Sequence, residues 1–322
     1  MKSKKSKTLA EIGSKTLIIG FSCCLLAACG NPYSKTNRFY KKRAKRYAEQ
    51  LRPLPPNESA DTSLTYGDYA VATTNFNLRK PDYVVIHHTA QDSLNQTLRT
   101  FTLQRTQVSA HYVIGDNGKI YHMLNDYYRA WHGGVGQWGN NTDLNSSSIG
   151  IELDNDGFEV FSDKQIKSLL ALLKDLKQQY KIPAMNFIGH SDIAPSRKID
   201  PNANFPWKKL AEEGYGLWYD QKQVDSLKFA PAPASQEVKQ LMQTYTLEGL
   251  APQLPLLDRL VFQNTIPADF DYIQALKIIG YDVSDIDSAI QAFELHFIQE
   301  NINGVLDHYD LKVLYNLYKK YL

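Results

Sequence analysis

Cysteine is scarce in this sequence of 322 residues, and its three cysteines, Cys23, Cys24 and Cys29, all lie near the N-terminus. The first two belong to an apolar segment that we expect to be removed on export, which leaves Cys29 without a partner. The mature protein is therefore expected to have no disulfide bond. The apolar segment covers about a dozen residues, whereas a helix that spans a membrane needs roughly 20.

An excess of basic residues is also missing. The whole chain has 36 basic and 34 acidic residues, but five lysines and one glutamate precede Cys29, so the rest has 31 basic and 33 acidic residues. A protein that binds nucleic acid usually shows a basic bias over a whole domain. We therefore expect no nucleic acid among its partners.

The first 28 residues have the parts of an export signal. A basic stretch with five lysines precedes apolar residues 17–28, and small residues then lead into Leu26-Ala27-Ala28-Cys29. This end resembles a bacterial lipobox, which implies cleavage before Cys29 and a lipid anchor on its thiol. Gly30, rather than Asp, follows the cysteine, and this resemblance favours the outer membrane, facing the periplasm. The alternative is an ordinary signal peptide that is cleaved elsewhere.

Residues 29–62 are expected to form a tether between Cys29 and the folded part. Prolines at positions 53, 55 and 56 stiffen a polar stretch. A basic cluster precedes them, made up of Lys41, Lys42, Arg43, Lys45 and Arg46. This cluster is either a solvated helix face or a contact with anionic lipid or polymer near the anchor.

The stretch 186–207, NFIGHSDIAPSRKIDPNANFPW, has the strongest chemical character. Phe187-Ile188-Gly189 predicts the end of a buried strand, after which His190 emerges and a loop delivers Lys198 and Asp200. Buried charge is costly unless it is paired or binds a metal, and zinc accepts both imidazole and carboxylate ligands. A catalytic zinc site normally has three protein ligands and one open position.

Two other strands carry candidate residues. The apolar run that begins at Tyr83 ends in His87 and His88, and strand alternation allows only one of these histidines to point at a given metal. In the strand 149–153, alternation places Glu152 on the face opposite Ile149. A hairpin is expected over 109–124, and capped helices over 93–101 and 162–180. The order of these elements predicts an α/β (α+β) fold with a mixed central sheet flanked by helices.

Further histidines are ambiguous when taken singly. His111 and His122 lie in strand patterns and are expected to be structural. His132 lies between Trp131 and two glycines, and either a substrate contact or a structural role fits it. Asp192 is expected to structure its loop rather than to bind metal.

The motifs IHHTA, SAHYVI, AWHGG, IGIEL and GHSDIAPSRKIDP occur in this order between residues 83 and 218. Together they resemble the zinc-dependent N-acetylmuramoyl-L-alanine amidases, relatives of the peptidoglycan-recognition proteins, with particular similarity to lipoprotein amidases of Gram-negative envelopes. The resemblance implies that His87, His190 and Asp200 bind Zn²⁺. It also implies Glu152 and Lys198 as catalytic residues. Trp131 and His132 are our candidates for contacts with the substrate. Ile199 and His122 depart from the residues more common in the family.

The implied reaction cleaves the amide bond between N-acetylmuramic acid and L-alanine of peptidoglycan or muropeptides. Zinc would activate water and polarise the scissile carbonyl, Glu152 would transfer the proton, and Lys198 would help to stabilise the oxyanion.

Residues 63–220 are thus expected to form the catalytic domain, and residues 221–262 a linker with connecting helices. Three short helices are expected over 263–322, with Gly280 ending the first and Asp307 capping the third. This region resembles the three-helix peptidoglycan-binding module appended to such amidases. A packing or dimerising bundle is the alternative, and His296 and His308 are expected at its surface or in structural roles.

Two other functions compete with zinc hydrolysis. A non-catalytic lipoprotein of the same fold could bind peptidoglycan or muropeptides, but the complete set of His87, His190 and Asp200 argues against it. A glycosidase could use Glu152 and a second carboxylate, but this reading leaves the histidines unexplained.

Overall fold

The computed structural model describes residues 31–51, 80–230 and 264–322. The chain divides into two compact units, residues 1–76 and 77–322. The expected export signal, Cys29 and the prolines of the tether lie outside the described residues. None of the described helices is both long and apolar enough to cross a membrane.

In the first unit, the described residues form the helix α1 (Ser34–Gln50). Much of the expected tether is therefore helical. The basic cluster lies on α1 and all five of its side chains are exposed, as expected for a solvated helix face.

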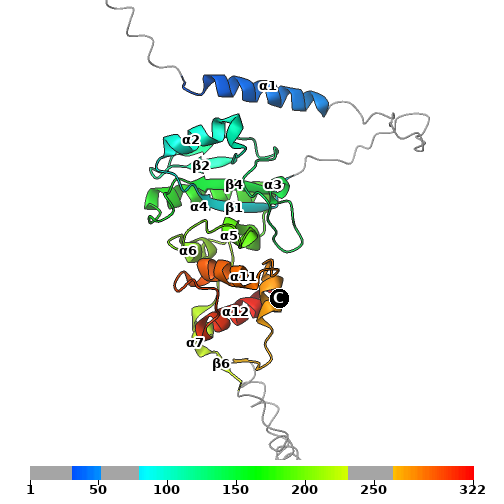
Figure 1. Cartoon of the computed structure of the whole chain (residues 1–322), viewed down its shortest axis with the longest axis vertical. Helices are drawn as coiled ribbons and strands as arrows, with labels where there is room; N and C mark the ends of the chain where they lie inside the picture. Colours follow the sequence, from blue (N-terminus) through cyan, green and yellow to red (C-terminus); the bar gives the residue numbers. More distant parts are fainter. Residues whose placement is uncertain (1–30, 52–79, 231–263) are drawn as a thin grey trace, which may run out of the picture. The chain divides into compact units, whose positions relative to one another are not determined.

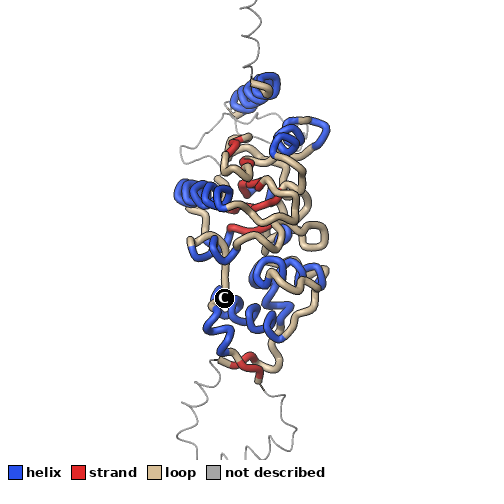
Figure 2. The backbone as a smooth tube through the Cα atoms, turned by 90° about the vertical axis from the view of Figure 1, so that its left-hand side faces the viewer, coloured by secondary structure: helices blue, strands red, loops and turns tan. Residues whose placement is uncertain are grey.

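A mixed five-stranded sheet forms the centre of the second unit, in agreement with the predicted fold class (Figures 1 and 2). Its order is β3-β2-β4-β1-β5. Neighbouring strands are parallel except β2 and β3, which form the expected antiparallel hairpin. The bounds are β1 (Tyr83–His88), β2 (Tyr112–Ile114), β3 (Ile120–His122), β4 (Ser148–Leu153) and β5 (Phe187–Gly189).

One face of this sheet packs on helix α4 (Asp163–Tyr180). Ser162 caps the helix by accepting the N–H of Gln165, as expected. In a full capping box the Gln165 side chain would accept the backbone N–H of Ser162. Here it donates to the carbonyls of Ile114 and Asp154 and thereby links α4 to the sheet. The core between them contains Val84, Ile86, Ile149, Ile151, Leu153, Ile166, Leu169 and Leu173. The alternate residues of β1 and β4 therefore point to the opposite face, where the polar residues lie.

Short helices connect these elements. They are α2 (Leu94–Thr102), η1 (Gln104–Thr106), α3 (Leu144–Ser147), η2 (Ala184–Asn186), α5 (His190–Ile193) and α6 (Trp207–Glu212). Ser93 caps α2 through the N–H of Gln96, as the sequence predicts.

The C-terminal region contains the three expected helices, α10 (Tyr272–Ile279), α11 (Ile286–Phe293) and α12 (His308–Tyr321). Gly280 ends α10 with a φ of 139°, and the Asp307 side chain caps α12. The π-helix η3 (Glu294–Ile298) continues α11. The expected linker begins with a helix, α7 (Gln221–Ser226), whose Val224 is buried, and β6 (Lys228–Phe229) pairs with β7 (Thr265–Ile266).

The C-terminal helices and the sheet share a hydrophobic core. Val85, Ile188 and Ile193 belong to the same buried cluster as Leu276, Ile279, Ile290, Phe293 and Leu314. Helix α11 contacts α5 (Figure 1). Helix α5 directly follows β5 in the chain. The C-terminal helices are therefore packed against the part of the chain that carries the candidate site.

Candidate active site

The candidate site lies where the parallel strands β1 and β5 end. His87 lies near the end of β1, and His190 follows the last residue of β5 as the first residue of α5. Glu152 on β4 is the register partner of His87, so the two residues are adjacent on the same face of the sheet. Carboxyl ends of parallel strands are a common place for binding sites, because loops from several strands meet there.

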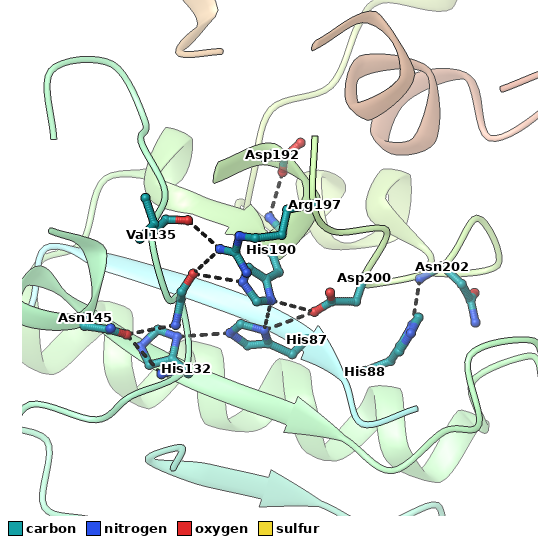
Figure 3. Close-up of polar contacts among 12 residues, drawn as sticks. His87, His88, His132, Val135, Asn145, His190, Asp192, Arg197, Asp200 and Asn202 are labelled. Atoms are coloured by element: carbon teal, nitrogen blue, oxygen red, sulfur yellow. Dashed lines mark hydrogen bonds and ion pairs between the residues drawn. The ribbon is translucent and has the colours of Figure 1, made fainter. Parts of the chain in front are cut away.

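Three potential ligand atoms converge at this point (Figure 3). The Nδ1 atoms of His87 and His190 are 2.9 Å apart, and each lies 3.1 Å from Oδ2 of Asp200. All three residues are buried. This is the one group of metal-ligand type found among the residues that the structure describes.

A chain of hydrogen bonds sets the tautomer of His87. The Ser148 hydroxyl donates to the Leu144 carbonyl, so its oxygen accepts from Nε2–H of His132, 3.1 Å away. Nδ1 of His132 then carries a lone pair and accepts from Nε2–H of His87 at 3.0 Å. Nδ1 of His87 is left with a lone pair that points into the group. Burial, and next the charge of His190, lowers the pKa of His87 to about 4, which keeps this ring neutral near pH 7.

His190 is oriented in the same way. Its Nε2–H donates to the Gly133 carbonyl at 3.0 Å, which leaves Nδ1 as the ring nitrogen that faces the group and can present a lone pair to a cation. Two imidazole lone pairs and a carboxylate oxygen that face one another repel unless a cation lies between them. This set of donors therefore suits a divalent metal.

The spacing of the donors fits zinc. Zinc bonds of about 2.0–2.1 Å at tetrahedral angles place ligand atoms about 3.3 Å apart. The observed separations of 2.9–3.1 Å are within a few tenths of an ångström of that value. Imidazole nitrogen and carboxylate oxygen are both ligands that zinc accepts, and three protein ligands leave a fourth position open.

Asp200 is held as an anion although it is buried. Burial acts to raise the pKa of Asp200, but the rings of His190 and His87 beside the carboxylate outweigh it, so the pKa lies well below its usual range. The backbone N–H of Ser191 donates to the Asp200 carbonyl at 2.8 Å. This bond joins the segments that carry two of the three potential ligands.

His88 points away from the group, which confirms that only one of the two adjacent histidines can face it. Its Nδ1 accepts the backbone N–H of Asn202 at 3.1 Å (Figure 3). Burial lowers its pKa. His88 therefore organises the loop that follows Asp200.

Glu152 is buried on the same face as His87. Burial, followed by the negative charge of Asp200, raises its pKa well above 4.5, and the positive charge of Lys198 opposes this shift. Lys198 itself is partly exposed. A carboxyl group whose pKa is raised holds a proton more readily than an exposed one, which suits a group that accepts and then releases a proton.

His132, for which the sequence left a substrate contact and a structural role open, is bound by protein groups. Both of its ring nitrogens are occupied by protein groups, and its own backbone N–H donates to Asn145 Oδ1 at 3.0 Å. A side chain at Gly150 would place a Cβ 2.4 Å from Cγ of His132, so the glycine in the IGIEL strand makes room for this ring. Trp131, by contrast, is 42 % exposed.

Three further residues, His111, His122 and Arg197, contact protein groups. Buried His111 donates to the Tyr128 carbonyl, and Nε2 of His122 lies 3.3 Å from Oδ1 of Asp126, as expected for structural residues. Arg197 was not singled out, but its guanidinium donates to the Gly133 carbonyl at 2.7 Å and thereby joins the AWHGG loop to the loop of His190. The only sign of this role in the sequence is that Arg197 lies between His190 and Lys198 in the motif GHSDIAPSRKIDP.

Comparison with known proteins identifies the family of this chain. Residues 77–203 match the family model described as N-acetylmuramoyl-L-alanine amidase. The amidase AmiD of Escherichia coli K12 is 33 % identical over 260 residues, which cover 74 % of this chain and 82 % of AmiD. The chain belongs to the N-acetylmuramoyl-L-alanine amidases. It is accordingly an enzyme of the amide hydrolase class.

Solved structures extend the likeness beyond the catalytic segment of this amidase. A complex of E. coli AmiD with the substrate anhydro-N-acetylmuramic acid-L-Ala-D-gamma-Glu-L-Lys matches with a TM-score of 0.58 and 30 % identity, over 78 % of this chain and 93 % of that one. AmpDh3 of Pseudomonas aeruginosa matches with a TM-score of 0.57 and 29 % identity, over 80 % and 99 %. The E. coli 1,6-anhydro-N-acetylmuramyl-L-alanine amidase AmpD is 40 % identical over 104 residues, which cover 32 % of this chain and 57 % of AmpD.

Proposed function

We propose that this amidase hydrolyses the amide bond between the lactyl group of N-acetylmuramic acid and L-alanine, with a zinc ion bound by His87, His190 and Asp200. The observation that carries the proposal is the convergence of two imidazole lone pairs and one carboxylate oxygen, 2.9–3.1 Å apart, in a buried site. Hydrogen bonds outside the group fix both imidazoles in the orientation needed for this arrangement.

A bound zinc ion supplies Lewis-acid activation of water and of the scissile carbonyl. Glu152 takes up the proton of the attacking water and passes it to the departing amine of L-alanine. Its burial supports this role, because a raised pKa lets the carboxyl group hold the proton between the two transfers. Lys198 places a positive charge near the oxyanion of the tetrahedral intermediate.

The substrate class follows from the relatives and from the rim of the site. The AmiD and AmpDh3 structures contain anhydromuramic peptides. We propose that this chain also acts on muropeptides or peptidoglycan, with the exposed indole of Trp131 as a contact surface for the substrate. An aromatic ring that is 42 % exposed beside buried polar residues suits such a contact.

Incubation of purified muropeptides with the full-length enzyme tests the function. We expect mass spectrometry to show free stem peptides with L-alanine at the N-terminus, together with peptide-free sugars, and we expect a chelator to stop their formation. Products that are cut between sugars and are insensitive to the chelator would instead indicate a glycosidase. Intact muropeptides that stay bound to the protein would indicate a binding lipoprotein without catalysis.

The location is proposed from the N-terminal sequence. Cleavage before Cys29 and lipidation of its thiol would anchor the enzyme in the outer membrane, facing the peptidoglycan of the periplasm. Replacement of Cys29 by Ser is expected to move the enzyme from the membrane fraction to the soluble fraction of the envelope. If the variant still sedimented with outer membranes to the same extent, the anchor would lie elsewhere.

A further inference from the structure

Asp192 links the site to the C-terminal helices. It lies two residues after His190 on α5, and its side chain is fully buried (Figure 3). One carboxylate oxygen accepts from the Tyr281 hydroxyl at 2.8 Å, and the other accepts from Nδ1 of His296 at 2.8 Å. The second oxygen also accepts the backbone N–H of Gly189 at 2.7 Å, which holds the start of α5.

The partners of Asp192 determine whether its burial is tolerated. A buried carboxylate needs several hydrogen bonds to replace water, and its destabilising effect is large when a partner is lost. Two of the three donors just described, Tyr281 and His296, come from the C-terminal region. Burial, followed by the charge of Asp192, raises the pKa of Tyr281, so the phenol keeps its proton and remains a donor.

The same C-terminal segment also holds the loop that follows Asp200. The Gln299 amide donates to the carbonyls of Ala203 at 2.8 Å and Phe205 at 2.6 Å. The His296 ring stacks on Trp207, with ring centroids 3.9 Å apart and planes 14° apart. The π-helix η3 and the residue after it therefore contact both the segment between His190 and Asp200 and the segment that follows Asp200.

The shape of this segment is itself fixed. A π-helix is rare and often occurs at functional sites, and η3 ends at Gln299 in a left-handed conformation with a φ of 64°. The Glu294 carboxylate accepts the backbone N–H groups of Asn303 and Gly304 at 2.6 and 2.8 Å, which closes the turn beyond it. His296 and Gln299 are thus presented from a defined backbone rather than from an open loop.

We propose that Tyr281, His296 and Gln299 form a brace that positions His190 and Asp200 for metal binding, so that the C-terminal helices are a structural part of the active site. The proposal rests on the proposed zinc site. The three residues are positioning residues, because they act through Asp192 and through the backbone after Asp200. The shared core of the sheet and the C-terminal helices supports a permanent contact between these regions.

Single-atom and side-chain variants of the full-length protein test the brace. Tyr281→Phe removes one hydroxyl, and His296→Leu removes the ring donor while keeping an apolar side chain. His296→Asn retains a donor near the position of Nδ1. Tyr180→Phe is the matched control. The Tyr180 hydroxyl also donates to a carboxylate at 2.8 Å, but this carboxylate belongs to Asp126, outside the segments that carry His190 and Asp200.

The main readouts are the zinc dissociation constant, from competition with a chromogenic chelator, and the visible absorption spectrum of the Co²⁺-substituted protein. Loss of partners beyond the direct ligands typically weakens metal binding by about 10–100-fold. We expect a weakening in this range and an altered Co²⁺ spectrum for Tyr281→Phe and His296→Leu. His296→Asn should recover part of the affinity, and Tyr180→Phe should bind zinc like the wild type.

Thermal unfolding of each variant separates positioning from a general loss of stability. If Tyr281→Phe and His296→Leu fold and match the wild type in zinc affinity and Co²⁺ spectrum, the brace is wrong. An equal loss of zinc affinity in Tyr180→Phe would also overturn it. These measurements need no substrate, so a wild type that binds zinc but cleaves no muropeptide would overturn the proposed function and leave the test of the brace intact.

Discussion

Replacement of Glu152 by Gln is expected to reduce muropeptide hydrolysis by about 10²–10⁴-fold while one zinc ion stays bound per chain. Gln has the shape of Glu but cannot take up a proton, and Glu152 lies beside His87 without belonging to the convergent group. The measurement is the rate of stem-peptide release at saturating substrate, together with the metal content of the purified variant. Glu159→Gln is the control, because Glu159 follows the same strand but is exposed.

The stability of the metal-free variant provides a second check on the environment of Glu152. Because burial raises the pKa of this carboxyl group above 4.5 in the folded protein, the unfolded chain loses the proton first as the pH rises. The wild type therefore loses stability from pH about 4.5 upward until the folded pKa is reached, and Glu152→Gln escapes this loss. In chelator-treated protein, the melting temperature of Glu152→Gln relative to that of the wild type should increase as the pH rises through this range.

Near-normal hydrolysis by Glu152→Gln would refute the role of Glu152 as the base.

His87 and His88 are adjacent in the sequence, so His88→Ala can serve as the control for His87→Ala. His87→Ala is expected to lose stoichiometric zinc and nearly all hydrolysis, because it removes one of three converging donors. This loss should exceed the roughly 10–100-fold weakening that is typical of changes beyond the direct ligands. Metal analysis after dialysis and the rate of stem-peptide release measure the two effects.

His88→Ala should keep zinc and most of the activity. Its ring accepts the backbone N–H of Asn202, so the variant is expected to lose about 1–3 kcal/mol of stability from the unsatisfied donor. A variant pair in which His88→Ala lost the metal and His87→Ala kept it would show that the assignment of the two residues is reversed.

Much of the site could be predicted from local patterns. His87 and His190 lie at strand ends, and the alternation of β4 places Glu152 on the face away from the core, as strand geometry requires. The helix caps at Ser93, Ser162 and Asp307 were also predictable, because the residue types and their spacing decide them locally.

The remaining features depend on contacts between distant parts of the chain. For His132 the sequence left a substrate contact and a structural role open, and no spacing in the sequence indicates the hydrogen bonds of its ring with His87 and Ser148. Asp192 and His296 are 104 residues apart, and each looks like an isolated polar residue until the fold brings them together. Residues 34–50 were expected within a tether in which the basic cluster could form a solvated helix face, and they form the helix α1, but their sequence does not show how far the helix extends.

The central claim, a zinc ion bound by two imidazoles and one carboxylate, is tested most directly by X-ray absorption at the zinc edge of the full-length protein. We expect one zinc ion per chain, nitrogen and oxygen neighbours at about 2.0–2.2 Å, and multiple-scattering features of two histidine rings. His87→Ala should lose one of these rings or the zinc altogether. A shell of oxygen atoms without histidine scattering, or a sulfur neighbour at about 2.3 Å, would contradict the account.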